Sequence, residues 1–278
     1  MNQHDLASAL LCICQQASAE ILKVYQRDDF SIAAKEDHSP VTAADLAAHQ
    51  VIRAGLSDLT PEIPQLSEED TELTYQKRKV WQQFWCIDPL DGTKEFINRN
   101  DEFTINIALI ENNRPIFGII YVPVSGVAYW GGNEIGAWKQ EEGRAPAQIR
   151  SRPLGKDLIV ASSRRHGQEA NENLMLPIAK QFSQISHRGM GSSLKMCLIA
   201  EGIADFYPRL YPTSEWDTAA AQAILEAAGG RLVNAETLEG LTYNLRESLE
   251  NPYFFACGDP QFPLEVLRNH LASGSQNG

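Results

Sequence analysis

The sequence has no long apolar run and no excess of positive charge. No stretch approaches the ~18 apolar residues that suggest a membrane-spanning helix. The 278 residues include 24 Lys and Arg against 36 Asp and Glu, which gives a formal net charge of −12. Duplex nucleic acids are bound mainly by Lys and Arg that neutralise phosphates, so this composition disfavours a duplex nucleic acid as partner. A small anionic substrate is still compatible with it where bound cations reverse the local field.

Cysteine is also scarce, and its five positions show no pairing pattern. They stand at 12, 14, 86, 197 and 257, each in an apolar stretch and without a CxxC motif. We therefore expect small buried side chains in a reducing compartment. The apolar N-terminal segment has no preceding Lys or Arg and carries Asp5, unlike a signal peptide, so a cytoplasmic protein is expected. The composition does not reveal an oligomeric partner or a peripheral association with the inner membrane.

The pattern of the chain changes near residue 150. Apolar residues recur every three or four positions from Leu6 to Val24, which predicts an amphipathic helix with Asp5 as its N-cap. A second helix is expected from about residue 41 to 59. Short strands separated by turn residues predict an antiparallel meander, at 103–110, 115–122, 126–130 and 135–139. Residues 1–150 are therefore predicted to form an α+β domain.

From about residue 157 the expected strands and helices alternate, which favours an α/β domain over residues 151–278. Strands are predicted at 158–162, 184–186, 204–207, 231–233 and 253–256. Helices are predicted at 168–181, 192–200, 215–228 and 260–271. Acidic residues stand at element ends in both halves, where α/β folds place ligand sites. We therefore expect the functional site in the cleft between the two domains.

The most informative segment is WCIDPLDGTKEF, residues 85–96. An apolar strand leads into Asp88 and Asp91, in a turn that Pro89 and Gly92 make tight, with the Leu90 carbonyl between the two carboxylates. Mg²⁺ prefers oxygen ligands and is usually held by a few carboxylates plus phosphate oxygens. The segment therefore predicts half of a magnesium site for phosphate-ester chemistry. Asp-Pro and Asp-Gly are also ordinary turn dipeptides, so a purely structural turn is the alternative.

Three further acidic positions each have two interpretations. Asp45 follows the start of the second helix, where the macrodipole also favours an acid. The segment Glu68-Glu69-Asp70 ends a short strand and also fits a solvated acidic loop. Asp217 completes a capping box with Ser214 at the N-cap. From the residues alone, a shared site and three separate structural roles stay open.

Four motifs in the right order and spacing resemble one enzyme family. Asp88-Pro-Leu-Asp91-Gly-Thr93 and Trp216-Asp217-Thr-Ala-Ala-Ala resemble the two signatures of the inositol monophosphatase superfamily. Ser67-Glu68-Glu69 and Ser39-Pro-Val-Thr42-Ala-Ala-Asp45 match its upstream motifs. The segments 92–96, 191–195 and 207–209 resemble the CysQ-type 3′(2′),5′-bisphosphate nucleotidases of that superfamily. The likeness extends from about residue 6 to 255 and implies a layered α-β-α-β-α sandwich.

The resemblance also implies roles for individual residues. It implies two or three Mg²⁺ ions, held by Glu68, Asp88, the Leu90 carbonyl, Asp91 and Asp217. It assigns the positioning of the attacking water to Asp45 and Thr93, with the assistance of Glu68. Substrate contacts are expected from Glu68, Leu90, Asp91, Gly92, Thr93, Ser192, Ser193, Lys195, Arg209 and Asp217. Ser192 and Ser193 have a second interpretation as caps of the following helix, Lys94 as a surface lysine, and Tyr207 as a core residue.

The implied activity is hydrolysis of the 3′-phosphate of 3′-phosphoadenosine 5′-phosphate, a phosphoric monoester hydrolase reaction linked to sulfate assimilation and sensitive to lithium. Lys195 and Arg209 would bind the second phosphate, because Arg suits bidentate phosphate contact. An inositol or sugar phosphate monoesterase of the same superfamily is the nearest alternative. A non-catalytic nucleotide-binding regulator is a second one. His38, His49, His166 and His187 show no metal-ligand spacing, and we interpret them as surface or loop residues.

Overall fold

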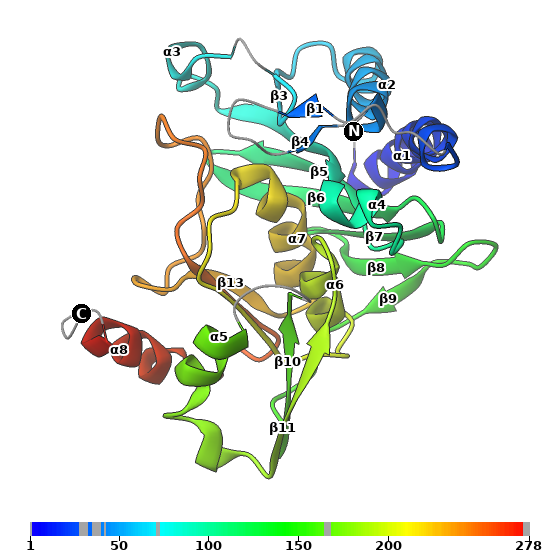
Figure 1. Ribbon diagram of the computed structural model, residues 1–278. Helices are drawn as coiled ribbons and strands as arrows, with labels where there is room; N and C mark the ends of the chain where they lie inside the picture. Colours follow the sequence, from blue (N-terminus) through cyan, green and yellow to red (C-terminus); the bar gives the residue numbers. More distant parts are fainter. Residues whose placement is uncertain are drawn as a thin grey trace.

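Two β-sheets and the helices that cover them account for most of the chain (Figure 1). The computed structural model describes residues 2–27, 33–34, 40–41, 43–70, 73–163 and 168–274. In that part of the chain no helix is both long enough and apolar enough to span a bilayer.

Helices α1 (Gln3–Tyr25) and α2 (Ala43–Leu59) lie side by side against one face of the first sheet (Figure 1). The buried residues of α1 recur at helical spacing, as the sequence predicts. The predicted N-cap is wrong, because Asn2 caps the helix by accepting the Asp5 N–H at 2.9 Å. Asp5 instead lies in the first turn, where it accepts a hydrogen bond from Asn2 Nδ2 and complements the helix dipole.

The first sheet has seven strands in the order β3-β4-β5-β6-β7-β8-β9. Only β3 and β4 pair in parallel; the other neighbours are antiparallel, so the predicted meander is confirmed. The last strand, β9, is not predicted by the sequence. The strands are β3 (Gln65–Ser67), β4 (Gln83–Asp91), β5 (Thr104–Glu111), β6 (Arg114–Val122), β7 (Val127–Gly132), β8 (Gly136–Gln140) and β9 (Ala147–Ile149).

The second sheet has five strands in the order β11-β10-β12-β14-β13, with β10 parallel to both neighbours and the rest antiparallel. Its strands are β10 (Asp157–Ser162), β11 (Gln184–Gly189), β12 (Phe206–Arg209), β13 (Arg231–Asn234) and β14 (Phe254–Cys257). The helices of this half are α5 (Gln168–Met175), α6 (Leu194–Ala200), α7 (Glu215–Ala227) and α8 (Leu264–Gly274). The single helix predicted over 168–181 is wrong: α5 ends before Pro177, and a separate 3₁₀ turn follows at Ala179–Gln181.

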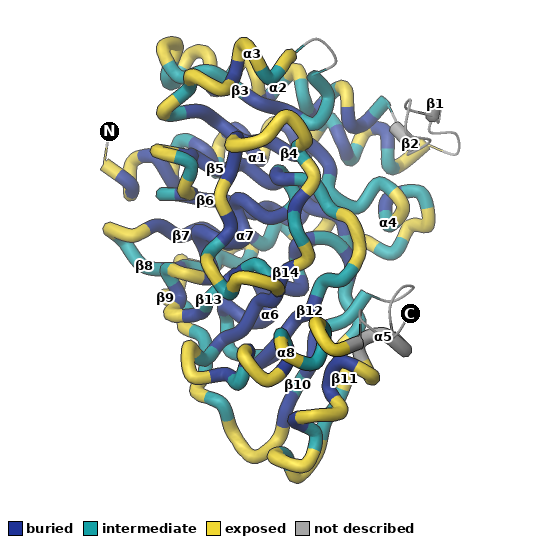
Figure 2. The backbone as a smooth tube through the Cα atoms, turned by 90° about the vertical axis from the view of Figure 1, so that its left-hand side faces the viewer, coloured by how far each residue is buried: buried dark blue, intermediate teal, exposed yellow. Residues whose placement is uncertain are grey.

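In the described part of the chain, three apolar cores separate five layers. The first core lies between α1, α2 and the first sheet, and the third between the second sheet and α5 and α8. The middle core joins both sheets to α6 and α7, and α7 is buried along most of its length (Figure 2). This arrangement confirms the predicted α-β-α-β-α sandwich, and its fold class is mixed α/β. The two sheets divide the chain between β9 and β10, and the domains 1–150 and 151–278 stay a prediction.

Four short elements lie between the longer ones: β1 (Ala33–Ala34) and β2 (Pro40–Val41), which form an antiparallel pair with each other, α3 (Tyr75–Arg78) and α4 (Thr93–Ile97). All five cysteines are free thiols, four of them buried as predicted. The prediction is wrong for Cys12, which is exposed because it lies on the outer face of α1.

Candidate active site

Three aspartates from both halves of the chain meet at one point. Asp88 and Asp91 lie on β4 and Asp217 on α7, and one carboxylate oxygen from each lies within 4.8 Å of the other two. Oxygen donors of this kind and spacing fit a hard divalent cation such as Mg²⁺. The structure therefore brings together the acids of the two sequence motifs.

The alternation of β4 aims Asp88 at α7. Phe84 and Cys86 belong to the middle core, whereas Trp85 and Ile87 face α1 and α2. Asp88 is next in the Phe84–Cys86 row, because alternate residues of a strand share a face. The segment from Asp88 to Asp91 is a bulge within β4 rather than the turn that the sequence predicts. Its partners, Asn106 and Thr104, are only two residues apart, so the extra residue brings both carboxylates to one side.

Close packing of α7 on the sheet brings Asp217 to the other two acids. A Cβ placed on Gly118 of β6 would lie only 2.4 Å from the Ala220 carbonyl oxygen. Glycine thus lets the helix approach more closely than any other residue would allow. Asp217 also accepts the Ser214 N–H at 2.8 Å, as a capping box requires. Both interpretations of Asp217 are therefore correct, because the same carboxylate caps α7 and belongs to the acidic cluster.

Ser193 links the acids of the two halves. Its N–H donates to Asp91 Oδ2 at 2.6 Å. Its Oγ lies 2.6 Å from the same oxygen and 2.9 Å from the Asp217 carbonyl oxygen. Ser193 is only 1% exposed, so its hydroxyl orients a carboxylate; its predicted contact with substrate stays a proposal.

Two polar residues of β5 that no sequence motif marks also reach Asp91. Asn106 Nδ2 lies 3.3 Å from Asp91 Oδ2 and 2.9 Å from Ser193 Oγ. Thr104 Oγ1 lies 3.5 Å from the same Asp91 oxygen. The available signal was the alternation of Thr104, Ile105, Asn106 and Ile107, which places two polar side chains on one face of an otherwise apolar strand.

Asp45 and Thr93 lie side by side at the edge of this cluster. Thr93 Oγ1 is 3.3 Å from Asp45 Oδ1 and 3.5 Å from the Leu90 carbonyl oxygen. Leu90 donates its N–H to Asp88 Oδ1 at 3.0 Å, which fixes the bulge. Glu68 directly follows β3, and its N–H donates to the Ile87 carbonyl beside Asp88. The sequence-predicted acids, the Leu90 carbonyl and Thr93 are therefore neighbours in space.

Burial and mutual repulsion raise the pKa values of two of these carboxylates. Burial, followed by the charges of Glu68 and Asp91, raises the pKa of Asp88 well above its usual range. Burial and the charge of Asp91 raise the pKa of Asp217 to about 7, against the opposing hydrogen bond from Ser214. Like charges in one buried site disfavour ionisation, and a bound divalent cation would reverse that preference. This donor set therefore fits Mg²⁺ on charge as well as on chemistry.

These shifts predict how the stability of the metal-free protein depends on pH. The folded state binds protons at Asp88 and Asp217 more tightly than the unfolded chain, so stability should fall as pH rises from about 4 to about 7. Mg²⁺ should raise the melting temperature more at pH 8 than at pH 5, by about 5 °C or more. Differential scanning fluorimetry with Mg²⁺ or with EDTA measures both effects.

Burial also raises the pKa of Glu215 to about 7, so this residue adds its own pH dependence to the stability. The difference between the melting temperatures in Mg²⁺ and in EDTA isolates the contribution of the acidic site. The variant D217N should lose most of the Mg²⁺-dependent increment. An equal increment at pH 5 and pH 8 in the unaltered protein would contradict the linkage.

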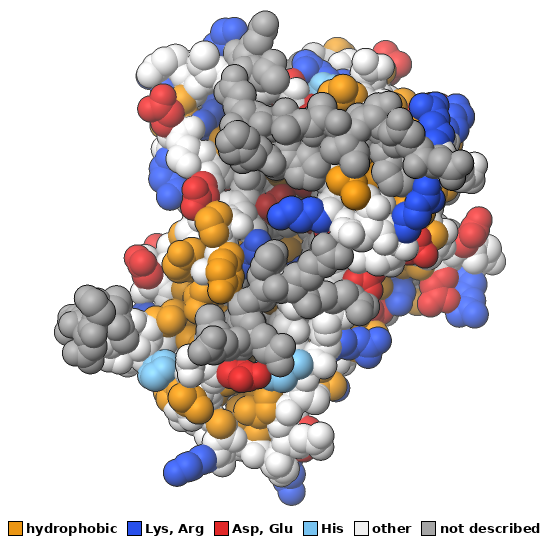
Figure 3. Space-filling model, in the orientation of Figure 1, with side chains coloured by type: hydrophobic (Ala, Val, Ile, Leu, Met, Phe, Trp, Pro, Cys, Tyr) orange, Lys and Arg blue, Asp and Glu red, His pale blue; other side chains and the backbone are white. Residues whose placement is uncertain are grey.

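A pocket opens beside the acids, between the two halves of the chain. It includes five of the predicted substrate residues other than the acids: Gly92, Ser192, Ser193, Lys195 and Arg209. Lys94 and Tyr207 line it as well, so Lys94 faces the pocket although it is exposed, and Tyr207 is both buried and at the pocket wall. Acidic and basic side chains meet near the middle of the face in Figure 3.

The two predicted phosphate ligands differ in how far their side chains are already engaged. Lys195 is buried, and its Nζ donates to the carbonyls of Ser192 at 2.6 Å and Met190 at 3.3 Å. Arg209 donates from Nε to Tyr211 and from Nη2 to Pro212. The charge of Arg209 lowers the pKa of Asp217, which places its guanidinium near the acids. Arg209 is therefore the cleaner probe of substrate contact.

The histidine prediction is wrong for His49, which lies half-buried on α2 with its Nδ1 2.8 Å from Ser67 Oγ. The prediction rested on the spacing between histidines, and that spacing does not indicate a contact between a histidine and a serine. His187 is exposed on β11, as expected. The predictions for His38, His166, Ser39 and Thr42 lie outside the described residues.

Comparison with known proteins gives a consistent result. The model of the inositol monophosphatase family matches residues 2–256. The 3′(2′),5′-bisphosphate nucleotidase CysQ of Salmonella typhimurium is 47% identical over 246 residues, which are 87% of this chain and 96% of that protein. The CysQ protein of Escherichia coli K12 is 46% identical over the same shares.

Solved structures agree with this result. CysQ from Bacteroides thetaiotaomicron, described as a bacterial member of the inositol monophosphatase family, is 37% identical. It superposes with a TM-score of 0.81 over 94% of this chain and all of that one. A Thermotoga maritima IMPase, 18% identical with a TM-score of 0.75 over 98% of this chain and 99% of that one, shares the fold. On the family match, on the relatives and on the placement of the motif acids, the chain belongs to the inositol monophosphatase family.

Proposed function

We propose that this protein is a Mg²⁺-dependent 3′(2′),5′-bisphosphate nucleotidase that hydrolyses the 3′-phosphate of 3′-phosphoadenosine 5′-phosphate to AMP and phosphate. The convergence of Asp88, Asp91 and Asp217 beside a pocket that carries Lys195 and Arg209 is the observation that supports it. The relatives that carry the name CysQ at 46–47% identity support the same substrate class. A role in sulfate assimilation follows from that reaction.

The metal ligands of this proposal are Glu68, Asp88, the Leu90 carbonyl, Asp91 and Asp217. Two or three Mg²⁺ ions would offset about four negative charges, which otherwise repel a phosphate, and would stabilise the attacking and leaving oxygens of an in-line displacement. Ser193 and Asn106 keep Asp91 aimed at the site through the contacts described above. Li⁺ would inhibit, because it supplies less charge in the same place.

Thr93 and Asp45 would orient the attacking water. The Thr93 hydroxyl, 3.3 Å from Asp45 Oδ1, can donate to that carboxylate and accept from a water at the same time. Asp45 is 1% exposed, so its charge is little screened there. Glu68 would assist in taking up the proton. Gly92, at φ +92°, turns the chain so that its own N–H and that of Thr93 can meet phosphate oxygens.

The substrate preference is the direct test of this function. Phosphate release should be followed with Mg²⁺ from 3′-phosphoadenosine 5′-phosphate and, at equal concentration, from myo-inositol 1-phosphate. We expect at least a tenfold preference for the nucleotide, because one added charge-assisted phosphate contact is worth about 1.5–3 kcal/mol. A preference for the inositol ester would overturn the substrate and retain the metal site. Tight nucleotide binding without phosphate release would favour a non-catalytic regulator.

Arg209→Gln tests the contact to the second phosphate. The variant should lower kcat/KM for the nucleotide about tenfold or more and change that for the inositol ester less than threefold. Lys195 is less suited, since it is buried and its removal would leave the Met190 and Ser192 carbonyls without their ammonium partner, whereas the carbonyls that Arg209 contacts belong to the exposed residues Tyr211 and Pro212. Equal losses on both substrates would place Arg209 outside the recognition of the second phosphate. The matched control is Arg188→Gln, an exposed position on β11 away from the pocket.

A further inference from the structure

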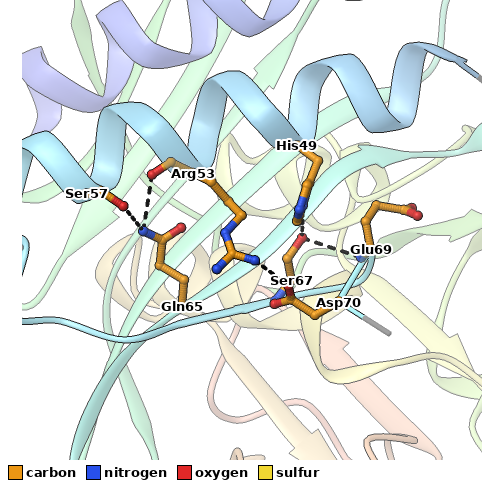
Figure 4. A network of polar contacts seen from close by, with 7 residues as sticks. All are labelled: His49, Arg53, Ser57, Gln65, Ser67, Glu69 and Asp70. Carbon is orange, nitrogen blue, oxygen red and sulfur yellow. Dashed lines mark hydrogen bonds and ion pairs between the residues drawn. The ribbon is translucent and has the colours of Figure 1, made fainter. Parts of the chain in front are cut away.

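One face of α2 carries four polar side chains spaced four residues apart: Asp45, His49, Arg53 and Ser57. We call this set the α2 polar stripe. Residues at i and i+4 lie above one another on a helix, so the stripe runs from the active-site end of α2 toward its C-terminal end. Figure 4 shows His49, Arg53 and Ser57 directed from the helix toward β3 and the residues after it.

One member of the stripe contacts an active-site residue, and the other three contact residues 65–70. Asp45 lies beside Thr93, as described above. His49 Nδ1 is 2.8 Å from Ser67 Oγ, and Arg53 Nη1 donates to Asp70 Oδ1 at 2.6 Å. Gln65 Nε2 reaches Ser57 Oγ at 3.1 Å and the Arg53 carbonyl at 3.2 Å. The stripe thus holds residues 65–70, the segment that carries Glu68.

This segment forms a closed turn around Glu68. Asp70 Oδ2 accepts the Ser67 N–H at 2.9 Å, and the Asp70 N–H donates to the Ser67 carbonyl at 3.1 Å. Ser67 Oγ also accepts the Glu69 N–H at 3.4 Å. Glu68 itself is tied to β4 by its N–H, which donates to the Ile87 carbonyl. The turn therefore has one attachment to the strand of Asp88 and a second to α2.

We propose that His49, with Arg53 as a weaker second contact, is a positioning residue that holds the Glu68 turn in register with Asp88 and Asp45. The proposal rests on the proposed function only in taking Glu68 as a metal ligand. His49 touches none of the reacting groups, and it acts through Ser67, which is 2% exposed. Arg53 is 47% exposed along its side chain, so its ion pair with Asp70 is screened by water and weaker.

The electrostatic setting of His49 agrees with this role. Burial lowers the pKa of His49, against the charge of Asp70. A neutral ring offers an acceptor nitrogen, and Ser67 Oγ, which accepts from Glu69, still has a proton to donate. The Glu69 N–H then donates to Ser67 Oγ, and the Ser67 hydroxyl donates to His49 Nδ1.

The test is metal affinity in the absence of substrate. Mn²⁺ binding, followed by electron paramagnetic resonance, should weaken about tenfold in H49L, because the Glu68 turn is no longer held on α2. H49N places an amide near the position of Nδ1 and should stay within threefold of the unaltered protein. R53M should lose no more than about threefold. Q50L, an exposed change on the same helix, is the matched control and should bind as the unaltered protein does.

A double-mutant cycle distinguishes positioning through Ser67 from a merely structural role of His49. S67A removes the other half of the contact, so H49L and H49L/S67A should show the same loss of affinity. S67A carries the test by itself where H49L does not fold. Unchanged Mn²⁺ affinity in H49L or S67A, or equal losses in H49N and H49L, would overturn the proposal. An unaltered protein that binds Mn²⁺ yet releases no phosphate would overturn the proposed function and leave the positioning role to be decided by the same titrations.

Discussion

Asp88→Asn is expected to lower kcat for the bisphosphate nucleotide about a thousandfold, equivalent to about 4 kcal/mol of barrier. The change removes the negative charge of a proposed metal ligand that is 1% exposed and lies next to Asp91 and Asp217. It also removes the repulsion between Asp88 and the charges of Glu68, Asp91 and Asp217, which together with burial raises the pKa of Asp88. The metal-free variant should therefore be as stable as the unaltered protein or more stable, since an uncompensated buried charge is costly. Phosphate release at saturating Mg²⁺ and a thermal melt in EDTA measure the two effects.

The opposite signs of these effects make the prediction specific. A misfolded variant would lose activity and stability together, whereas loss of a metal ligand lowers only activity. Asp58→Asn is the matched control, because Asp58 is exposed on α2 and distant in sequence from every motif acid on β4 and α7. Near-normal turnover in the Asp88 variant would rule out the assignment of the metal site.

Gly118→Ala is expected to lower both stability and activity, although residue 118 touches no substrate. The added Cβ would lie 2.4 Å from the Ala220 carbonyl oxygen and 2.7 Å from the Ala220 Cα, and both are backbone atoms. The helix α7 must then move outward, at a cost of about 1–3 kcal/mol for overpacking. Displacing Asp217 by as much as 1 Å should lower kcat about a hundredfold. A thermal melt and the phosphate-release assay check the two results.

Gly155→Ala provides the control for the generic effect of replacing glycine. An added Cβ there would meet no atom closer than 3.9 Å, so the variant should behave as the unaltered protein does. Full activity in the Gly118 variant would show that α7 and the sheet tolerate a wider separation, and that the close approach of Asp217 does not depend on residue 118.

Local periodicity made much of the fold predictable from the sequence. The strands of the meander alternate and α1 repeats every three to four residues, and these two periods belong to the chain itself. Predictions failed where a single residue competed with the pattern. Pro177 divides the helix expected over 168–181, and Asn2 takes the cap expected of Asp5.

The acids of the site were predictable because dense motifs mark them. The motifs did not indicate which residues hold these acids in place. Ser193 holds Asp91 across 102 positions of sequence, Asn106 joins them from β5, and His49 reaches Ser67 from α2. A serine, an asparagine or a histidine in isolation has many ordinary roles, and no local pattern distinguishes these.

The sequence by itself determined the element types, the family and the acids near the site. Those properties depend on residue type and spacing along the chain, which one sequence records. The tertiary structure decided which groups hold the acids in place and how near Asp217 comes to Asp88. These depend on the distance between α7 and the sheet, set by Gly118 and Ala220, and on the bulge at Asp88–Asp91. Such distances are fixed only when the middle core packs. Packing brings together residues that are far apart in the sequence, and their separation along the chain does not predict the contact.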